Sequence, residues 1–257
     1  MRLFAISDLH LDYGPNLEWL ERLPLHEYND DVLILAGDLS DRLALLEAGF
    51  KAVAQRFSVV LYVPGNHDLW VTREGMRDSF EKWQAVCDAA TGYGIRMDVY
   101  RHHDLAIVPL LGWYDYSFGI ASDWLKGAWA DYRACRWPAG YDEVSITRFF
   151  TERNPDASTP ALQGAQQIIT FSHFLPRIDL MPARIPERHR RVYPVLGTST
   201  LEHQLRTLRS RMHVYGHSHV NRRVTLDGVT YVNNAFGYPS EAHFAARELL
   251  QVYGDGA

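Results

Sequence analysis

Five short apolar runs in this chain each end in aspartate, histidine or asparagine, and this recurrence constrains the fold more than any other feature. The runs span residues 3–6, 32–36, 59–63, 168–171 and 213–215. Each is too short for a helix and is rich in Ile, Val, Leu or aromatic residues, so each predicts a buried strand. A sixth run, residues 105–111, predicts a further strand that lacks such an ending.

The polar residues after these five strands are the candidate functional residues. In order along the chain they are Asp8 and His10, Asp38 and Asp41, Asn66, His67 and Asp68, His173, and His217 and His219. In open α/β sheets the carboxyl ends of the strands form the crevice in which ligands bind. We therefore expect these side chains to converge on one site.

Apolar residues at helical spacing lie between the early strands. They predict helices over residues 16–23, 40–56 and 78–90, with Ser40 capping the second, and a later helix over residues 198–209. The alternation of strand and helix in the first 90 residues indicates an α/β sheet with right-handed crossovers.

The later part of the chain has its own signals. Residues 220–226 and 229–232 flank an Asp-Gly pair and predict a hairpin, whereas residues 240–253 fit either a helix or a strand. We expect one domain over residues 1–257, with an aromatic-rich insertion at about 112–141 that holds four of the seven tryptophans. The insertion is either a lid that stacks on the substrate, or a satellite core or oligomer contact.

The residue types in the strand-end groups indicate a metal site. Carboxylate, imidazole and amide oxygen suit transition metals such as Mn, Fe and Zn, and the absence of cysteine argues against a structural zinc site. The strand ends supply more ligand side chains than one ion can bind. We therefore expect two ions about 3.5–4 Å apart, bridged by a carboxylate. Gly37, Gly65 and Gly216 would let the backbone approach the ions. In Asp-x-His and His-x-His, an extended backbone would place both side chains on one side.

Together these motifs resemble the calcineurin-like metallophosphoesterase superfamily. The series D-x-H, G-D-x-x-D, G-N-H-D, a lone His and G-H-x-H is complete and spans residues 8–219. The resemblance implies an α/β fold, a four-layer αββα sandwich of two mixed sheets with the metal site at the strand ends. It also implies an enzyme, a dinuclear metal-dependent phosphomonoesterase or phosphodiesterase that uses a metal-bridging hydroxide as nucleophile.

The resemblance assigns a role to each motif residue. One ion would be held by Asp8, His10, Asp38 and His219, and the other by Asp38, Asn66, His173 and His217. Asp38 is then the bridge, His67 the general acid, and Asp68 the residue that orients His67. Asp41 would support the site, and Arg42 would contact phosphate.

Composition limits the partners. The net charge of −5 argues against nucleic acid, and no apolar run reaches the ~18 residues that a membrane span needs. Two cysteines without a C-x-x-C motif, and a chain that opens on a strand, lead us to expect a cytoplasmic protein. Five arginines follow His173 and either steer an anionic substrate or form a solvated face: Arg177, Arg184, Arg188, Arg190 and Arg191.

Three functions are compatible with the motifs. The first is a hydrolase of a small phosphorylated substrate, with Mn, Fe or Zn as cofactor. The second is a metallo-nuclease, against which the charge argues. The third is a protein-binding scaffold on the same fold, against which the complete set of ligand-type residues and His67 argues. The sequence leaves the substrate, the metal pair and the oligomeric state open.

Overall fold

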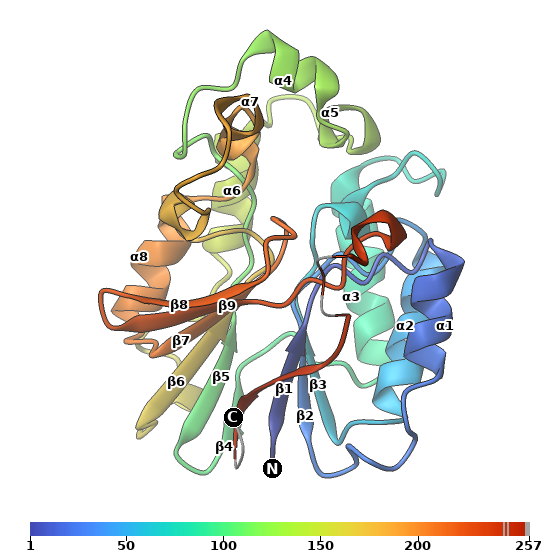
Figure 1. The fold of residues 1–257 in the computed structure, drawn as a ribbon, viewed down its shortest axis with the longest axis vertical. Coiled ribbons are helices and arrows are strands. Elements are labelled where there is room, and N and C mark those ends of the chain that lie inside the picture. Colours follow the sequence, from blue (N-terminus) through green and yellow to red (C-terminus); the bar gives the residue numbers. More distant parts are fainter. Residues whose placement is uncertain (244, 246, 255–257) are drawn as a thin grey trace.

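The computed structural model describes residues 1–243, 245 and 247–254, which form two β-sheets packed face to face between layers of helices (Figure 1). The first sheet has the strand order β10-β1-β2-β3. Its strands are β1 (Leu3–Ile6), β2 (Val32–Leu35), β3 (Val59–Tyr62) and β10 (Leu250–Tyr253). β1, β2 and β3 are parallel, and β10 pairs antiparallel with β1.

The second sheet has the strand order β4-β5-β6-β7-β9-β8. Its strands are β4 (Tyr100–His102), β5 (Leu105–Pro109), β6 (Gln167–Phe171), β7 (Met212–Tyr215), β8 (Arg222–Leu226) and β9 (Val229–Asn233). The four central strands are parallel, and the edge strands β4 and β8 are antiparallel to their neighbours. Both sheets are therefore mixed, as predicted.

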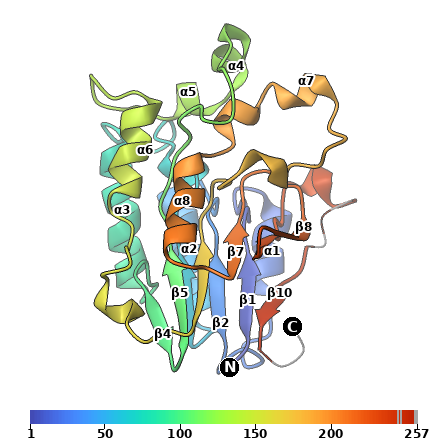
Figure 2. The ribbon, with the colours of Figure 1, turned by 90° about the vertical axis from the view of Figure 1, so that its left-hand side faces the viewer.

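Helices cover the outer face of each sheet (Figure 2). The first sheet is covered by α1 (Gly14–Glu21), α2 (Leu43–Ala54) and α3 (Ser79–Gly92), and the second by α6 (Glu143–Thr151) and α8 (Ser199–Thr207). Three short helices lie toward the end of the molecule where the central strands finish: α4 (Asp123–Ala128), α5 (Asp131–Ala134) and α7 (Glu187–Arg190). The four-layer αββα prediction is confirmed.

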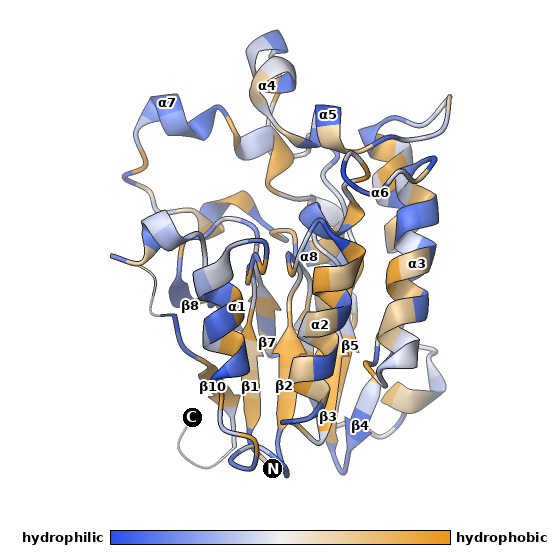
Figure 3. Cartoon of the chain, turned by 90° about the vertical axis from the view of Figure 1, so that its right-hand side faces the viewer, coloured by the Kyte–Doolittle hydropathy of each residue, from blue (hydrophilic) through white to orange (hydrophobic). Residues whose placement is uncertain are grey.

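Strands β1, β2, β3 and β5 are apolar on both faces because both faces are covered (Figure 3). Leu3, Val32 and Ile34 of the first sheet pack against Ile107 and Phe171 of the second, and all five are fully buried. Continuous apolar strands of this kind are typical of parallel sheets with helices or another sheet on each side. The described residues contain no helix long and apolar enough to cross a membrane.

Most predicted elements are present, with shifted ends. The helix predicted from Ser40 begins at Leu43, because the backbone amide of Ser40 donates to Asp68 and the Ser40 hydroxyl accepts from the amide of Arg42. The predicted hairpin has positive φ at Asp227 (48°) and Gly228 (82°), as a type I′ turn requires. The undecided tail contains strand β10; its positions 244 and 246 lie outside the described residues.

The aromatic-rich stretch at 112–141 has a buried part and an exposed part. Trp113 and Tyr114 are each 1% exposed and pack in the core between the second sheet and its helices. Trp124, on α4, is 52% exposed. The stretch therefore contributes to the core of the second sheet, where Leu125 of α4 is also fully buried, and it leaves Trp124 exposed.

Candidate metal centre

Loops at the carboxyl-terminal edges of both sheets bring the candidate ligands together. Among the described residues, three groups of Asp and His donor atoms lie within 4.8 Å of one another. The groups are Asp8, His10 and His219; His10, Asp38 and His67; and Asp38, His173 and His217. These residues follow β1, β2, β3, β6 and β7, so the predicted convergence of the strand ends is observed.

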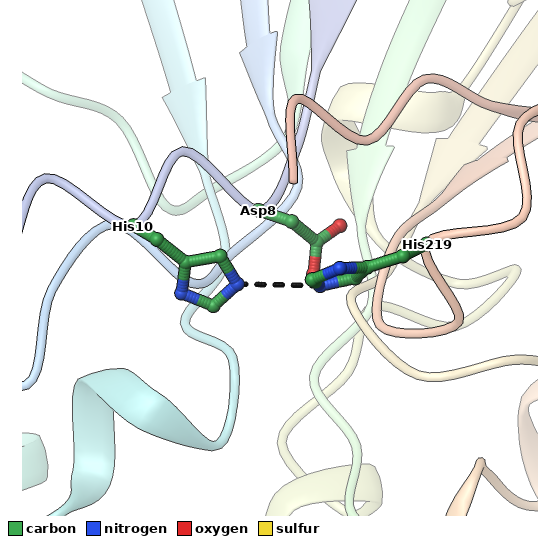
Figure 4. A group of neighbouring side chains, drawn as sticks. All are labelled: Asp8, His10 and His219. Atoms are coloured by element: carbon green, nitrogen blue, oxygen red, sulfur yellow. Dashed lines mark hydrogen bonds and ion pairs between the residues drawn. The ribbon is translucent and has the colours of Figure 1, made fainter. Parts of the chain in front are cut away.

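The first group joins Asp8 and His10, which follow β1, to His219, which follows β7 (Figure 4). His219 Nε2 lies 3.2 Å from Asp8 Oδ1 and 3.2 Å from His10 Nε2. Two imidazole nitrogens and a carboxylate oxygen this close together can share one cation at the ~2.0–2.2 Å that nitrogen and oxygen ligands adopt.

The third group is centred on His173, which is 1% exposed. His173 Nε2 lies 3.1 Å from His217 Nδ1, 3.1 Å from Asn66 Oδ1 and 3.5 Å from Asp38 Oδ1. Two imidazoles, an amide oxygen and a carboxylate form a donor set that suits Mn, Fe or Zn.

Asp38 links the first and third groups. Its Oδ1 faces His173, and its Oδ2 lies 3.9 Å from His67 Nε2. Asp38 also shares a donor group with His10, which belongs to the first cluster. A carboxylate shared by two ions would need this central position.

The loops that carry the ligands are not extended, so the expectation from the Asp-x-His and His-x-His spacing is wrong. The φ angles are 55° at Asp8, 43° at His10, 56° at Asp38, 68° at His217 and 52° at His219. Left-handed backbone costs a non-glycine residue roughly 1–3 kcal/mol and clusters at functional sites. Main-chain bonds such as His10 N to Asp38 O (3.0 Å) hold these turns in place.

Three of the candidate ligand histidines are oriented through the ring nitrogen that faces away from the donor group. The pairs are His173 Nδ1 with Ala36 O (2.8 Å), His217 Nε2 with Val195 O (3.0 Å) and His219 Nδ1 with Glu241 Oε2 (2.7 Å). Donation to these oxygens leaves a lone pair on the opposite nitrogen. Such hydrogen bonds from the second ring nitrogen fix the tautomer and the orientation of metal-ligating histidines.

Asn66 is oriented by Asp131, which lies at the start of α5. Asp131 Oδ1 accepts from Asn66 Nδ2 (2.8 Å) and from Trp70 Nε1 (2.8 Å), and its Oδ2 accepts from Trp129 Nε1 (2.7 Å). Because the amide nitrogen of Asn66 faces Asp131, its oxygen faces His173. Residues of the aromatic-rich stretch therefore support the candidate metal centre.

Burial keeps most of the site histidines neutral. Burial, with contributions from neighbouring imidazoles, lowers the pKa of His10 to about 3 and the pKa values of His173 and His217 to about 4. The same causes hold the pKa of His67 well below its ordinary value. Neutral imidazole is the form that binds a metal.

Buried carboxylates lie close together at the site, and a cation would reduce their mutual repulsion. Burial, then the charges of Asp8 and Asp68, raise the pKa of Asp38. Burial opposes the charge on His219, but Asp8 and Glu241 outweigh it and raise the pKa of His219 to about 10. Crowded buried carboxylates fit positively charged ions, and a cation at the first group would replace the proton on His219.

His67 lies between two aromatic side chains rather than beside a carboxylate of its own loop. Trp70 stacks on its ring with centroids 3.7 Å apart and an interplanar angle of 26°, and Tyr238 Oη lies 3.4 Å from His67 Nε2. The ring borders an open pocket of about 340 Å³. The residues that line this pocket are His10, Asp12, Tyr13, Asp41, His67, Trp70, Arg73 and Tyr238.

Among the described residues, Asp68 makes its hydrogen bonds to the loops after β2 and β3 and to Tyr62 rather than to the ring of His67. The Asp68 carboxylate accepts from the backbone amides of residues 38–40 and of Gly65, at 2.8–3.0 Å, and from Tyr62 Oη at 2.7 Å. These five donors use both carboxylate oxygens. Asp68 therefore joins the loop after β2 to the loop after β3 and acts on the site through the backbone.

Arg42 does not reach the pocket. It is exposed and precedes α2, whereas Arg73 lines the pocket with Nε 3.4 Å from Asp41 Oδ2 and Nη1 3.9 Å from Asp12 Oδ1. Burial and the neighbouring Asp12 raise the pKa of Asp41 to about 6. Arg73 is thus the arginine that the fold places at the site.

Two glycines allow the close approach of the loops. Gly37 has a φ of 86°, and a Cβ there would lie 2.5 Å from His173 Nδ1. A Cβ at Gly65 would overlap Asp38 Oδ1 and lie 2.7 Å from the Asp38 backbone nitrogen. Both positions therefore require glycine, as the sequence predicts.

Comparison with known proteins identifies the family. The profile of the calcineurin-like phosphoesterases matches residues 1–221. The chain belongs to this family. It is therefore a metal-dependent phosphoester hydrolase, which confirms the enzyme prediction.

Two comparisons extend over nearly the whole chain. The chain is 27% identical over 264 aligned residues to the [acyl-carrier-protein] phosphodiesterase PptH of Mycobacterium tuberculosis, covering 93% of this chain and 78% of that protein. The crystal structure of that organism's phosphopantetheinyl hydrolase PptH matches with a TM-score of 0.75 and 26% identity, over 99% of this chain and 96% of that one.

Several site residues were missed by the sequence analysis, for different reasons. Trp70 and Arg73 lie a few positions after His67 in the segment that follows β3. Their closeness to the G-N-H-D motif in the sequence is the signal that could have identified them. Tyr238 and Glu241 follow β9, which the sequence predicts only as the second strand of a hairpin and not as a strand that leads to the site. Asp131 has no sequence signal, because only the fold brings it to Asn66.

Proposed function

We propose that this protein is a dinuclear metal-dependent phosphodiesterase that releases a phosphopantetheinyl group from a carrier protein. The metal chemistry is supported chiefly by the position of Asp38 between two donor groups. The substrate rests on the likeness to PptH, and it replaces the small phosphorylated molecule expected from sequence. A single domain over residues 1–257 and a cytoplasmic location remain proposals based on the sequence.

The donor set fits two cations. One would be held by Asp8, His10, Asp38 and His219, and the other by Asp38, Asn66, His173 and His217. When bound, the ions supply positive charge that activates water and neutralises the phosphoryl oxygens. Mn, Fe and Zn all suit these donors.

His67 is the proposed general acid. Its ring borders the open pocket, and Trp70 and Tyr238 fix its orientation from two sides. Attack by water forms one P–O bond, and the carrier oxygen leaves with a proton from His67. A phosphodiester anion beside the ring favours the protonated imidazole that this step needs.

The test is cleavage of a phosphopantetheinyl carrier protein by the purified protein after chelation and after Mn²⁺ is added back. Mass spectrometry should show loss of the phosphopantetheinyl group only with the metal. Asp38→Asn should lose both this activity and much of the bound metal. Metal-dependent cleavage of nucleic acid with no action on the carrier would favour the nuclease alternative instead.

A further inference from the structure

A second hollow surface lies on the segments that border the candidate metal centre. Its two pockets, of about 460 and 510 Å³, share Phe118, Arg190 and Tyr193. Ile120 (94% exposed) and Trp124 (52% exposed) line the first pocket. Figures 1 and 2 both show α4 and α7 at the end of the molecule where the central strands finish.

This surface is basic although the protein is acidic overall. Residues 183–191 contain four arginines against one glutamate, Glu187, in a chain of net charge −5. Among the described residues, none of these four arginines has an acidic side chain within ion-pair distance. Arg191 instead lies 5.6 Å from the ring centroid of Trp124. The four arginines are Arg184, Arg188, Arg190 and Arg191.

The surface is tied to the candidate metal centre through two short links. Tyr193 and Pro194 line the first pocket, and the carbonyl of the next residue, Val195, accepts from His217. On the other side, Trp129, the residue after α4, lies 5.9 Å from the His217 ring. A macromolecule bound here would therefore be beside the reacting phosphodiester.

From this arrangement we propose that the exposed surface formed by Ile120, Trp124, Arg188 and Arg191 docks an acidic face of the carrier protein. Arginine and tryptophan are residue types enriched at the centres of protein interfaces, and here exposed arginines without an acidic partner lie near an exposed tryptophan. Complementary charge speeds and orients the encounter, and the apolar side chains supply contact area. The inference rests on the proposed function, because it assigns the docking partner of the same site.

The test compares two charge reversals of equal size. Arg188→Glu/Arg191→Glu alters the docking surface. Lys51→Glu/Arg211→Glu is the matched control, because both residues are exposed and lie near the last turn of α2 and just before β7, away from the strand ends that carry the ligands. The readouts are kcat/KM for the phosphopantetheinyl carrier protein and for bis(p-nitrophenyl) phosphate.

We expect the docking variant to lose on the order of 10-fold in kcat/KM for the carrier, mostly through KM, and to keep its activity on the small diester. Trp124→Ala should show the same selectivity with less dependence on salt. Equal carrier kinetics in the docking and control variants would overturn the proposal while leaving the proposed function intact. Binding of nucleic acid or anionic vesicles at this surface, with unchanged carrier kinetics, would also overturn it. A wild-type protein that neither binds nor cleaves the carrier would refute the proposed function as well.

Discussion

Asp131→Asn is the substitution that most sharply tests how the fold supports the metal centre. Asp131 is 2% exposed and accepts from Asn66 and Trp70 on one oxygen and from Trp129 on the other. Asparagine has the same shape, but only one of its two terminal atoms is an oxygen that can accept a hydrogen bond. Its amide group must then face a buried N–H donor on the other side.

Two separate losses are expected. A buried donor left without a partner costs about 1–3 kcal/mol of folding stability, and loss of the charged acceptor adds to this. If the new amide turns its nitrogen toward Asn66, the Asn66 amide loses the contact that keeps its oxygen facing His173. Loss of a hydrogen bond that orients a metal ligand typically lowers metal affinity 10–100-fold.

The assay pairs denaturant unfolding of metal-free protein with calorimetric titration of Mn²⁺. Asp31→Asn is the matched control, because Asp31 is also buried and hydrogen-bonded, by Arg2, but lies away from the ligands. Both variants should be less stable, and only Asp131→Asn should bind one of its two ions more weakly. Wild-type affinity for both ions in Asp131→Asn would refute the positioning role.

Three further outcomes are expected. His67→Ala should keep both metal ions and lose roughly 10²–10⁴ in rate with an alkoxide leaving group but less with p-nitrophenolate; an equal loss with both would contradict the acid role. Gly65→Ala should lower metal binding, because its Cβ would overlap Asp38 Oδ1. Gly92→Ala should bind metal normally, because a Cβ added at Gly92 meets no neighbouring atom within 4 Å. Burial raises the pKa of Asp31, but hydrogen bonds from Arg2 outweigh it and hold the pKa below the ordinary value. The charged Asp31 carboxylate therefore contributes its full stabilisation above about pH 4, and this contribution is lost as the pH falls through the lower pKa of the folded state. In urea unfolding measured at decreasing pH, the difference in unfolding free energy between wild type and Asp31→Asn should become smaller. A difference that stays constant with pH would contradict this.

The sequence predicts the parts of the site that short local patterns encode. Asp8, Asp38 and His173 each follow a buried apolar strand, and parallel strands end at one edge, so their convergence follows from topology. Sequence spacing does not encode backbone angles, which is why the left-handed turns at the ligands contradict the extended interpretation. It also cannot show that four of the five donors to Asp68 are backbone amides from two separate loops.

Contacts between distant segments account for the other differences. Arg42 follows the G-D-x-x-D motif directly, but the start of α2 places it in solvent, and Arg73 from the loop after β3 lines the pocket. Asp131 and Tyr238 reach the site from segments 65 residues after Asn66 and 171 residues after His67. No local pattern marks either residue, since each acquires its role only in the folded chain.

We propose that two ions sharing Asp38 drive cleavage of a phosphodiester on a carrier protein. The most direct test titrates metal-free protein with Mn²⁺ while bound ions per chain and release of the phosphopantetheinyl group are measured together. We expect no release without metal, and release that rises as the second ion binds. Full release by the chelated protein, or full release with one ion bound per chain, would contradict it.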